Sequence, residues 1–259
     1  MCHGVSPPDQ EQPLTVEHFD VLMGIAAEMG FESINYDDLE SWRKGNASLP
    51  NRPIMIDFDH PWKSIRYEMK SVLDRYGFKG NLFVHTKPLV DPSPPPRQPC
   101  MSWGELGELC SAGWPIGAHT HSHPNLSKLS FEDPDGLKVR EEIELNNALL
   151  KKHLGITVKD FAFTGTSYST QAANEIRKRY RFGRLWIKGT QYQVDGNPIR
   201  YAKLVGVSGP DLPDGGPPEA ARYITRNTHP HMLPSMEIQC LIYTPEAFRR
   251  YLEGALAEE

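Results

Sequence analysis

The chain has 259 residues, of which 28 are Lys or Arg and 33 are Asp or Glu, so its formal net charge is −5. A mildly acidic chain has no basic footprint for nucleic acid or for an anionic membrane surface. Hydrophobic residues make up 39% of the chain and charged residues 24%, a composition typical of a folded protein rather than a disordered one. A single αβ barrel needs about 250 residues, so we expect one domain over residues 1–259.

Helical and strand patterns alternate along the chain. Helical spacing of apolar residues, in several places closed by a glycine, predicts helices at residues 15–29, 37–44, 62–76, 102–111, 135–154, 171–180 and 244–257. Short apolar runs between them predict buried strands at residues 32–35, 53–59, 81–84, 115–118, 158–163 and 185–187. Strands separated by long helices imply right-handed βαβ units. The sequence therefore predicts an α/β barrel or near-barrel, with a doubly wound open sheet as the alternative.

The beginning of the chain and its cysteines carry no targeting or disulfide signal. No basic segment followed by an apolar one opens the sequence, and no apolar run approaches the about 18 residues of a membrane span. The four cysteines (Cys2, Cys100, Cys110 and Cys240) form no Cys-x-x-Cys pair, which favours free thiols in a reducing compartment. The sequence predicts a cytoplasmic protein unless a leader has been removed, without a membrane or nucleic-acid partner. It does not define the oligomeric state.

Polar side chains follow four of the predicted strands. The segments concerned are residues 57–60, His85, residues 119–124 and residues 164–167. Barrel and open-sheet enzymes place reactive groups at the carboxyl ends of parallel strands, which all lie on one side of the sheet. The sequence therefore predicts a functional site at this side.

The histidine-rich run from residue 119 to residue 123 is the strongest single signal. Imidazole is the commonest metal-binding side chain near neutral pH, and His119, His121 and His123 lie close together in the sequence. The alternative is a solvated turn without a metal. Asp59 and His60 at the end of another strand favour the metal site.

The carboxylates of Asp57 and Asp59 point to the same face if the strand is regular. Two carboxylates buried beneath a barrel mouth are costly unless a cation or hydrogen bonds compensate for their burial. The alternative is that one of them caps the helix that is expected to begin near Trp62. That alternative accounts for one carboxylate and not for both.

These motifs resemble those of the polysaccharide deacetylase, or NodB-homology, family of carbohydrate esterases. Residues 57–61, Asp-Phe-Asp-His-Pro, align with the family's Thr-Phe-Asp-Asp-Gly motif, and residues 119–124, His-Thr-His-Ser-His-Pro, match its His-(Ser/Thr)-x-x-His-Pro motif in full. Residues 161–166 are similar to a third motif of the type Phe-Ala-Tyr-Pro-x-Gly, and residues 2–5, Cys-His-Gly-Val, look like the family's first strand. The resemblance covers nearly the whole chain, although the first and third motifs are degenerate.

The resemblance implies a distorted (β/α)7-type barrel of the NodB-homology fold and a divalent metal site. By position, Asp59 is the catalytic base, and His60, His119 and His123 are the metal ligands, with His60 at the place of the family's metal-binding aspartate. Three neutral imidazoles suit Zn²⁺ and also tolerate Co²⁺, Ni²⁺ or Cu²⁺. Asp57 is expected either to orient a ligand histidine or to act as an alternative ligand, a choice that the sequence leaves open.

The remaining parts of the expected mechanism are weakly marked. Backbone near Thr164 and Gly165 is expected to stabilise the oxyanion, and Trp62 is expected to line the substrate site. The family's late general-acid histidine has no matching motif, so His229 and His231 are the candidates. No equivalent of the family's arginine is evident.

Three functions follow from this reading. The first is removal of acetyl groups from N-acetyl or O-acetyl saccharides through metal-activated water. The second is hydrolysis of a small cytoplasmic amide, imide or ureide at the same site. The third is a catalytically silent relative that binds a saccharide or a protein in the cleft.

Overall fold

The computed structural model describes residues 1–6 and 12–256. Its centre is a parallel six-stranded sheet in the order β11-β8-β6-β5-β4-β3. The strands are β3 (Asp57–Asp59), β4 (Asn81–Val84), β5 (Ile116–Ala118), β6 (Asp160–Ala162), β8 (Phe182–Ile187) and β11 (Leu233–Met236). Except for half-buried Trp186, every residue of these strands is buried, as expected for a parallel sheet covered on both faces.

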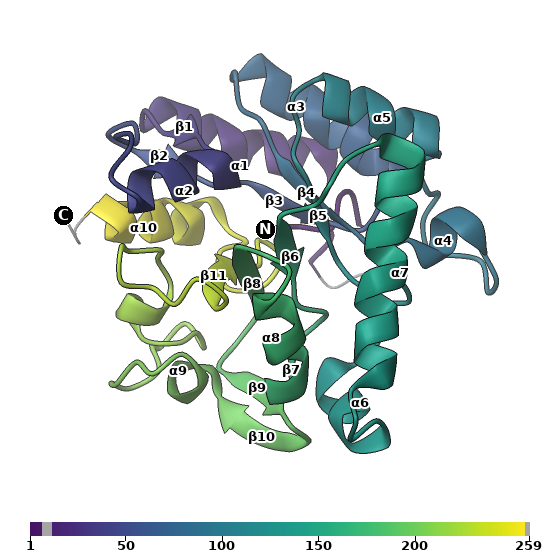
Figure 1. Cartoon of the computed structure of the whole chain (residues 1–259). Helices are drawn as coiled ribbons and strands as arrows, with labels where there is room; N and C mark the ends of the chain where they lie inside the picture. The colour runs from purple at the N-terminus through teal and green to yellow at the C-terminus, as the bar shows by residue number, and fades with distance from the viewer. Residues whose placement is uncertain (7–11, 257–259) are drawn as a thin grey trace.

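Helices surround the curled sheet (Figure 1). The longer ones are α1 (Val16–Glu28), α2 (Tyr36–Arg43), α5 (Trp103–Ser111), α7 (Leu137–Leu154), α8 (Thr170–Arg177) and α10 (Pro245–Leu256). The shorter ones are α3 (Lys70–Arg75), preceded by a π-helical turn (Ile65–Met69), α4 (Lys87–Val90), α6 (Leu126–Glu132), α9 (Tyr201–Leu204) and a 3₁₀ turn (Glu219–Ala221). None of the helices in the described part of the chain has both the length and the apolar character needed to span a membrane.

The helix ends follow their local sequence. Asn35 and Ser102 each begin a capping box, at α2 and α5, in which a side chain accepts hydrogen bonds from the otherwise unpaired amides of the first turn. The long helix α7 lies between Gly136 and Gly155, which have φ values of 70° and 72°. Glycine adopts this left-handed conformation at little cost, so it ends helices efficiently.

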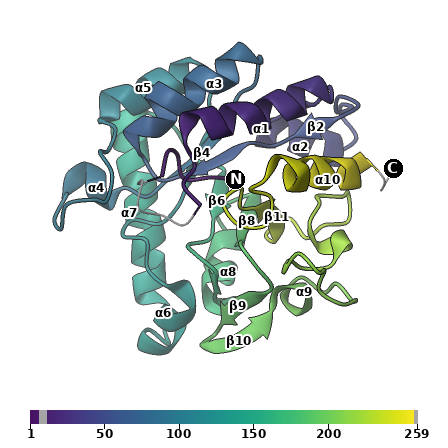
Figure 2. The same ribbon diagram turned by 180° about the vertical axis from the view of Figure 1, so that it is seen from behind.

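The amino-terminal segment fills the gap between the two edge strands. Cys2 donates its backbone N–H to Asp57 and accepts from Asp59, at 3.0 and 3.2 Å, and so pairs with β3 in parallel. On its other side, the carbonyl of Met1 accepts from Ile238, just beyond β11, at 3.0 Å. Figure 2 shows this end of the chain inside the ring of helices, close to β11. The segment thus completes the barrel at its seventh position.

Two smaller sheets lie at opposite ends of the barrel. The first pairs β1 (Glu32–Ser33) with β2 (Pro53–Ile54) before β3, at the amino ends of the barrel strands. The second has the order β10-β9-β7 and follows the carboxyl ends of β6 and β8. Its strands are β7 (Ser167–Tyr168), β9 (Gln191–Val194) and β10 (Asn197–Arg200). The carboxyl-end sheet borders the side on which the predicted site lies.

The structure confirms the predicted α/β barrel and differs in detail from the predicted elements. The helix expected from residue 62 begins at Ile65 with the π-helical turn, and the strand expected at residues 32–35 is shortened to two residues. The sequence analysis missed β11, whose Leu-Pro-Ser-Met sequence contains Pro234 and lacks an apolar run, as well as the β9–β10 hairpin. The expected end of the last helix, at residue 257, lies outside the described residues.

Candidate active site

Three imidazoles meet at the carboxyl ends of the barrel strands. His60 follows β3, and His119 and His123 follow β5. One ring nitrogen from each of the three lies within 4.8 Å of those of the other two. The structure therefore brings together the three residues that the sequence singled out as metal ligands.

The backbone at this cluster adopts a conformation that L-residues avoid. His60, Thr120 and His123 have φ values of 71°, 63° and 61°. Among the described residues only one further non-glycine residue, Asp195, has a positive φ. Left-handed backbone at non-glycine residues costs of order 1 kcal/mol or more each and concentrates at functional sites. The strain is therefore located where the candidate ligands are presented.

His119 has the environment of a metal ligand. Its Nδ1 donates a hydrogen bond to the carbonyl of Ala162 at 2.9 Å, which fixes the tautomer and leaves Nε2 with its lone pair. That Nε2 is buried and has no hydrogen-bond partner. A buried acceptor without a partner is costly, and a cation among the three nitrogens would satisfy it. The residues present therefore fit a divalent metal.

Helix α7 holds the loop that carries two of the ligands. The Glu142 carboxylate accepts the backbone N–H groups of His121 and Ser122 at 2.9 and 2.7 Å, and it also accepts the Ser122 hydroxyl. Asn146, one turn further along the same helix face, donates to the carbonyl of Thr120 and, at 2.9 Å, to that of Val84. The hydrogen bonds between these two side chains and the backbone of the loop help to offset the cost of its strained conformation.

His85, which follows β4, joins the cluster from another side. Its Nδ1 lies 3.0 Å from Nδ1 of His60, so one of the two nitrogens carries a hydrogen and donates a hydrogen bond to the other. Burial lowers the pKa of His85 to about 2 and the pKa of His119 to about 3. Burial also lowers the pKa values of His60 and His123. These rings are neutral near pH 7, which is the form that binds a metal.

Asp59 lies beside the imidazoles and is held by an arginine. Arg184, on β8, donates from Nη2 to Oδ1 of Asp59, and Oδ2 lies 3.8 Å from Nε2 of His119. Because three strands separate β3 from β8 in the sheet, this ion pair crosses the barrel interior. Burial alone would raise the pKa of the Asp59 carboxyl, but the guanidinium outweighs it and lowers the pKa below its usual value.

Arg184 was not singled out in the sequence analysis. It is 1% exposed, and it is the single charged residue of a strand that is otherwise Phe, Gly, Leu, Trp and Ile. A charge inside a buried strand is expensive unless it is paired. The single charged residue in an otherwise apolar strand was therefore the sequence signal that could have identified Arg184.

Asp57 does not join the metal cluster. Its carboxylate accepts from the Tyr36 hydroxyl at 2.8 Å and from the Asn81 amide at 3.1 Å, and it lies 3.6 Å from Nε of Arg184. These contacts of Asp57 include no candidate ligand histidine, so the structure does not bring Asp57 into either expected role, as a ligand or as a residue that orients one. Burial raises its pKa, against the effect of Arg184.

His3 and Glu237 complete the site and were not predicted as site residues. Nδ1 of His3 lies 3.2 Å from Oε2 of Glu237, and Nε2 lies 4.0 Å from Oδ2 of Asp59. The His3 ring stacks on His60 with 5.1 Å between centroids. Glu237 is 2% exposed and also accepts the indole N–H of Trp186 at 2.7 Å. The sequence signal that could have identified His3 was the similarity of residues 2–5 to the family's first strand.

His229 and His231 were assigned to the wrong end of the barrel. They precede β11 rather than follow a strand, and Nε2 of His231 bonds to the carbonyl of Tyr180, before β8, at 2.9 Å. Both therefore lie at the amino ends of the strands, whereas the imidazole cluster lies at the carboxyl ends. The structure therefore does not bring either predicted general acid to the imidazole cluster.

The expected substrate contacts are partly occupied by the protein itself. The Thr164 hydroxyl donates to the carbonyl of Pro124, and its own carbonyl accepts from Ser167 at 2.7 Å. Gly165 is half-buried with a φ of 59°. Trp62 is 9% exposed and its ring lies 5.2 Å from that of His60, so Trp62 forms a wall behind a candidate ligand rather than an open platform.

Comparison with solved structures shows the same fold in several deacetylases. The deacetylase PplD of Streptococcus pyogenes, solved with acetate, gives a TM-score of 0.68 at 14% identity over 97% of this chain and 94% of that one. IcaB from Ammonifex degensii gives 0.67 at 16% identity over 98% and 95%. BA0330 from Bacillus anthracis, a putative polysaccharide deacetylase, gives 0.66 at 16% identity over 97% and 67%. At these identities the likeness concerns the fold.

Comparison with curated sequences gives no match. The family model for polysaccharide deacetylases, in contrast, matches residues 46–180, which include the histidine cluster, Asp59 and most of the loops that carry them. This segment is more than half of the chain. The chain therefore belongs to the polysaccharide deacetylase family.

Proposed function

We propose that this protein is a metal-dependent hydrolase that removes acetyl groups, N-linked or O-linked, from saccharides. The observation that carries the proposal is the set of three imidazole nitrogens within 4.8 Å of one another beside the buried carboxylate of Asp59. Family membership supports the acetylated saccharide as the substrate class. The structural relative that was solved with acetate supports an acetyl group as the part removed.

The residues that would hold the metal are His60, His119 and His123. Three neutral nitrogen donors favour Zn²⁺ among the abundant divalent cations, with Co²⁺, Ni²⁺ and Cu²⁺ also compatible. When bound, such a cation polarises the acyl carbonyl and acidifies water. A ligand set without a carboxylate leaves the site one charge more positive than an Asp-His-His set, which strengthens both effects.

The protein's own residues would move the protons. Asp59, kept ionised by Arg184, accepts the proton of the attacking water at Oδ2, the oxygen that faces His119. His3 replaces the two rejected histidines as donor to the leaving nitrogen or oxygen, because its Nε2 faces the site while Nδ1 is held by Glu237. His3 and Glu237 thus have the geometry of a general acid that is oriented by a carboxylate.

The decisive test combines metal analysis with a substrate panel. The purified protein is stripped with a chelator, reloaded with Zn²⁺, and incubated with N-acetyl oligosaccharides, O-acetyl xylan, and a set of small amides, imides and ureides. Release of acetate from a saccharide only in the metal-loaded protein is expected. Turnover of the small amides, imides or ureides alone would indicate a small-molecule hydrolase instead. Stoichiometric metal without any turnover would indicate a catalytically silent relative.

The proton donor has a separate test. His3→Gln is expected to lower kcat by about a hundredfold, because a positioned general acid contributes at least that factor, and to leave the metal content unchanged. His18→Gln is the matched control, since His18 is on α1 and bonds to the carbonyl of Tyr243. Unchanged kcat in His3→Gln would exclude His3 as donor.

A further inference from the structure

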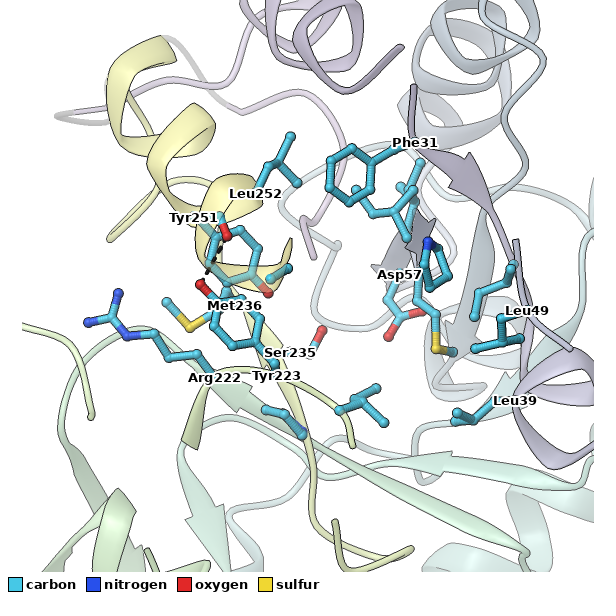
Figure 3. Close-up of a pocket in the computed structure, with 18 of the residues that line it drawn as sticks. Phe31, Leu39, Leu49, Asp57, Arg222, Tyr223, Ser235, Met236, Tyr251 and Leu252 are labelled. Carbon is cyan, nitrogen blue, oxygen red and sulfur yellow. Dashed lines mark hydrogen bonds between the residues drawn. The ribbon is translucent and has the colours of Figure 1, made fainter. Parts of the chain in front are cut away.

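The barrel contains a hollow at the end opposite the histidine cluster. It has a volume of about 570 Å³ and lies between the amino-end part of the chain around β2 and α2 on one side and α10 with β11 on the other. Small-molecule sites in proteins typically occupy about 300–1,000 Å³. Figure 3 shows its two walls facing each other across an open space, with Leu39 and Leu49 on one side and Tyr251 and Leu252 on the other.

The cavity exists because only the short amino-terminal segment fills the space between β3 and β11. At its first residue, Met1, the amino group donates to the carbonyl of Met236 at 2.7 Å and the carbonyl accepts from Ile238 at 3.0 Å. Met1 itself lines the hollow. Below that level, no backbone hydrogen bond joins β3 to β11 among the residues that the structure describes. The interior therefore opens under the segment instead of being filled by the side chains of a further strand.

The lining is mostly apolar, and its polar groups include a carboxylate and a hydroxyl that face each other across the cavity. Phe31, Leu39 and Leu252 are 4%, 2% and 2% exposed and supply the hydrophobic walls. Asp57 from β3 and Ser235 from β11 direct their oxygens toward the same space (Figure 3). An apolar hollow with a few convergent polar groups is the usual form of a ligand site.

The polar pair defines the head group that a ligand must have. The Asp57 carboxylate only accepts hydrogen bonds, and although Tyr36 and Asn81 already donate to it, each carboxylate oxygen has a second lone pair. The Ser235 hydroxyl both donates and accepts. A head group with an N–H or O–H donor satisfies both, whereas an anion would face the carboxylate.

The arginines near the mouth do not provide a site for an anion. Arg222 donates to both carboxylate oxygens of Asp214, at 2.7 and 2.6 Å, and to the carbonyl of Pro217 at 2.8 Å. Arg226 donates to the carbonyl of Trp42 and stacks over its ring. Both guanidinium groups are therefore engaged by the protein.

From these observations we propose that the cavity binds a small amphiphile with an apolar body and an uncharged or cationic head group that donates a hydrogen bond to Asp57 and Ser235. The apolar body packs between the α2 and α10 walls. This ligand site is separate from the histidine cluster, and its existence does not depend on the hydrolase activity.

The test uses three probes that share one tail and differ in the head: hexanol, hexylamine and hexanoate. Titration calorimetry on the full chain is expected to give saturable binding of hexanol and hexylamine and none of hexanoate. Each methylene added to the alcohol is expected to tighten binding about fourfold, the factor for burying one CH₂ group. Methyl resonances of Met55 and Met236, which line the cavity, are expected to shift with the same midpoint.

Variants locate the binding in the cavity. Leu39→Phe, and independently Leu252→Phe on the opposite wall, each place a larger side chain in the hollow and are expected to weaken binding severalfold, with circular dichroism confirming that each variant is folded. Ser235→Ala is expected to weaken hexanol binding about two- to tenfold through loss of one hydrogen bond.

Three outcomes would overturn the proposal. The first is the absence of saturable binding of hexanol and hexylamine. The second is undiminished binding in both Leu39→Phe and Leu252→Phe when these variants are folded. The third is hexanoate binding as tight as that of hexanol, which would contradict the assigned head group. None of these readouts requires activity, so a failure here is distinguishable from a failure of the proposed hydrolase function.

Discussion

The two halves of the barrel interior differ although one strand, β3, contributes a carboxylate to each. Asp59 lies at the carboxyl end among imidazoles, with a lowered pKa, and Asp57 lies at the amino end beside an apolar cavity, with a raised pKa. Both are buried and both are near Arg184, which donates to Asp59 but lies 3.6 Å from Asp57. The difference in pKa therefore comes from the neighbours and not from the residue type or its burial.

The largest expected contrast between the halves is in turnover. Asp59→Asn is expected to lower kcat by about a thousandfold, because the amide cannot accept the proton of the attacking water. Its metal content is expected to stay unchanged, since Asp59 is not one of the three clustered ligands. Asp57→Asn, the isosteric change in the other half, is expected to keep kcat within about threefold, because Asp57 is not near the reacting atoms.

Acetate release and bound metal, measured on both variants, check this prediction. Equal loss of kcat in the two variants would show that the two carboxylates act as one unit through Arg184. Full activity of Asp59→Asn would remove Asp59 from the mechanism. A loss of metal in Asp59→Asn would instead make Asp59 a ligand.

A second contrast concerns the loop that carries His119 and His123 at the carboxyl end of the barrel. Glu142→Gln weakens the hydrogen bonds that satisfy the loop between His119 and His123, and changes to groups that orient metal ligands typically cost ten- to a hundredfold in metal affinity. We expect a loss of about that size in Zn²⁺ affinity, measured by competition with a chelating dye. Glu141→Gln, an exposed neighbour on the same helix, is the control and is expected to bind as the wild type does.

The sequence could predict the parts of this site that are local in the chain. His60, His119 and His123 follow predicted parallel strands, whose carboxyl ends must lie on one side of a sheet. His3, Arg184 and Glu237 reach the site only through the pairing of the amino-terminal segment and of β8 and β11 with distant strands. A local sequence pattern does not indicate which distant strands pair with one another.

The error at His229 and His231 has the same origin. The strand β11 has the sequence Leu-Pro-Ser-Met, and proline and serine obscure the apolar run by which buried strands are recognised. Without β11, nothing in the sequence indicated that the two histidines precede a strand. The missed strand also hid Glu237, which directly follows it.

The pH dependence of stability in the metal-free protein offers a third contrast. The pKa values of His60, His85, His119 and His123 are lowered by burial, so below pH 6.5 the unfolded chain binds protons that the folded chain does not. Stability is therefore expected to fall as pH decreases from about 7 to about 5. His3 has a raised pKa and acts in the opposite direction, but it is one residue against four. We expect a net loss of about 2 kcal/mol or more over this interval.

Urea denaturation at the two pH values, with chelator present, measures this loss. His85→Asn is expected to reduce the pH dependence, because it removes one of the four groups, whereas His153→Gln, on the exposed surface of α7, is expected to leave it unchanged. Stability that is constant between these pH values would mean that the cluster is accessible to water and protons in the folded chain.

The smallest contrast tests whether Asp57 is ionised in its apolar half. Tyr36 donates to the Asp57 carboxylate at 2.8 Å, and Tyr180 donates to the neutral amide oxygen of Asn147 at 2.7 Å. A hydrogen bond to a charged group contributes about 1.5–3 kcal/mol and one to a neutral group about 0.5–1.5 kcal/mol. At pH 7 Tyr36→Phe is therefore expected to cost about 1 kcal/mol more in the free energy of unfolding than Tyr180→Phe. Equal losses would show that burial keeps Asp57 protonated at pH 7, in which case Arg184 is paired with Asp59 alone.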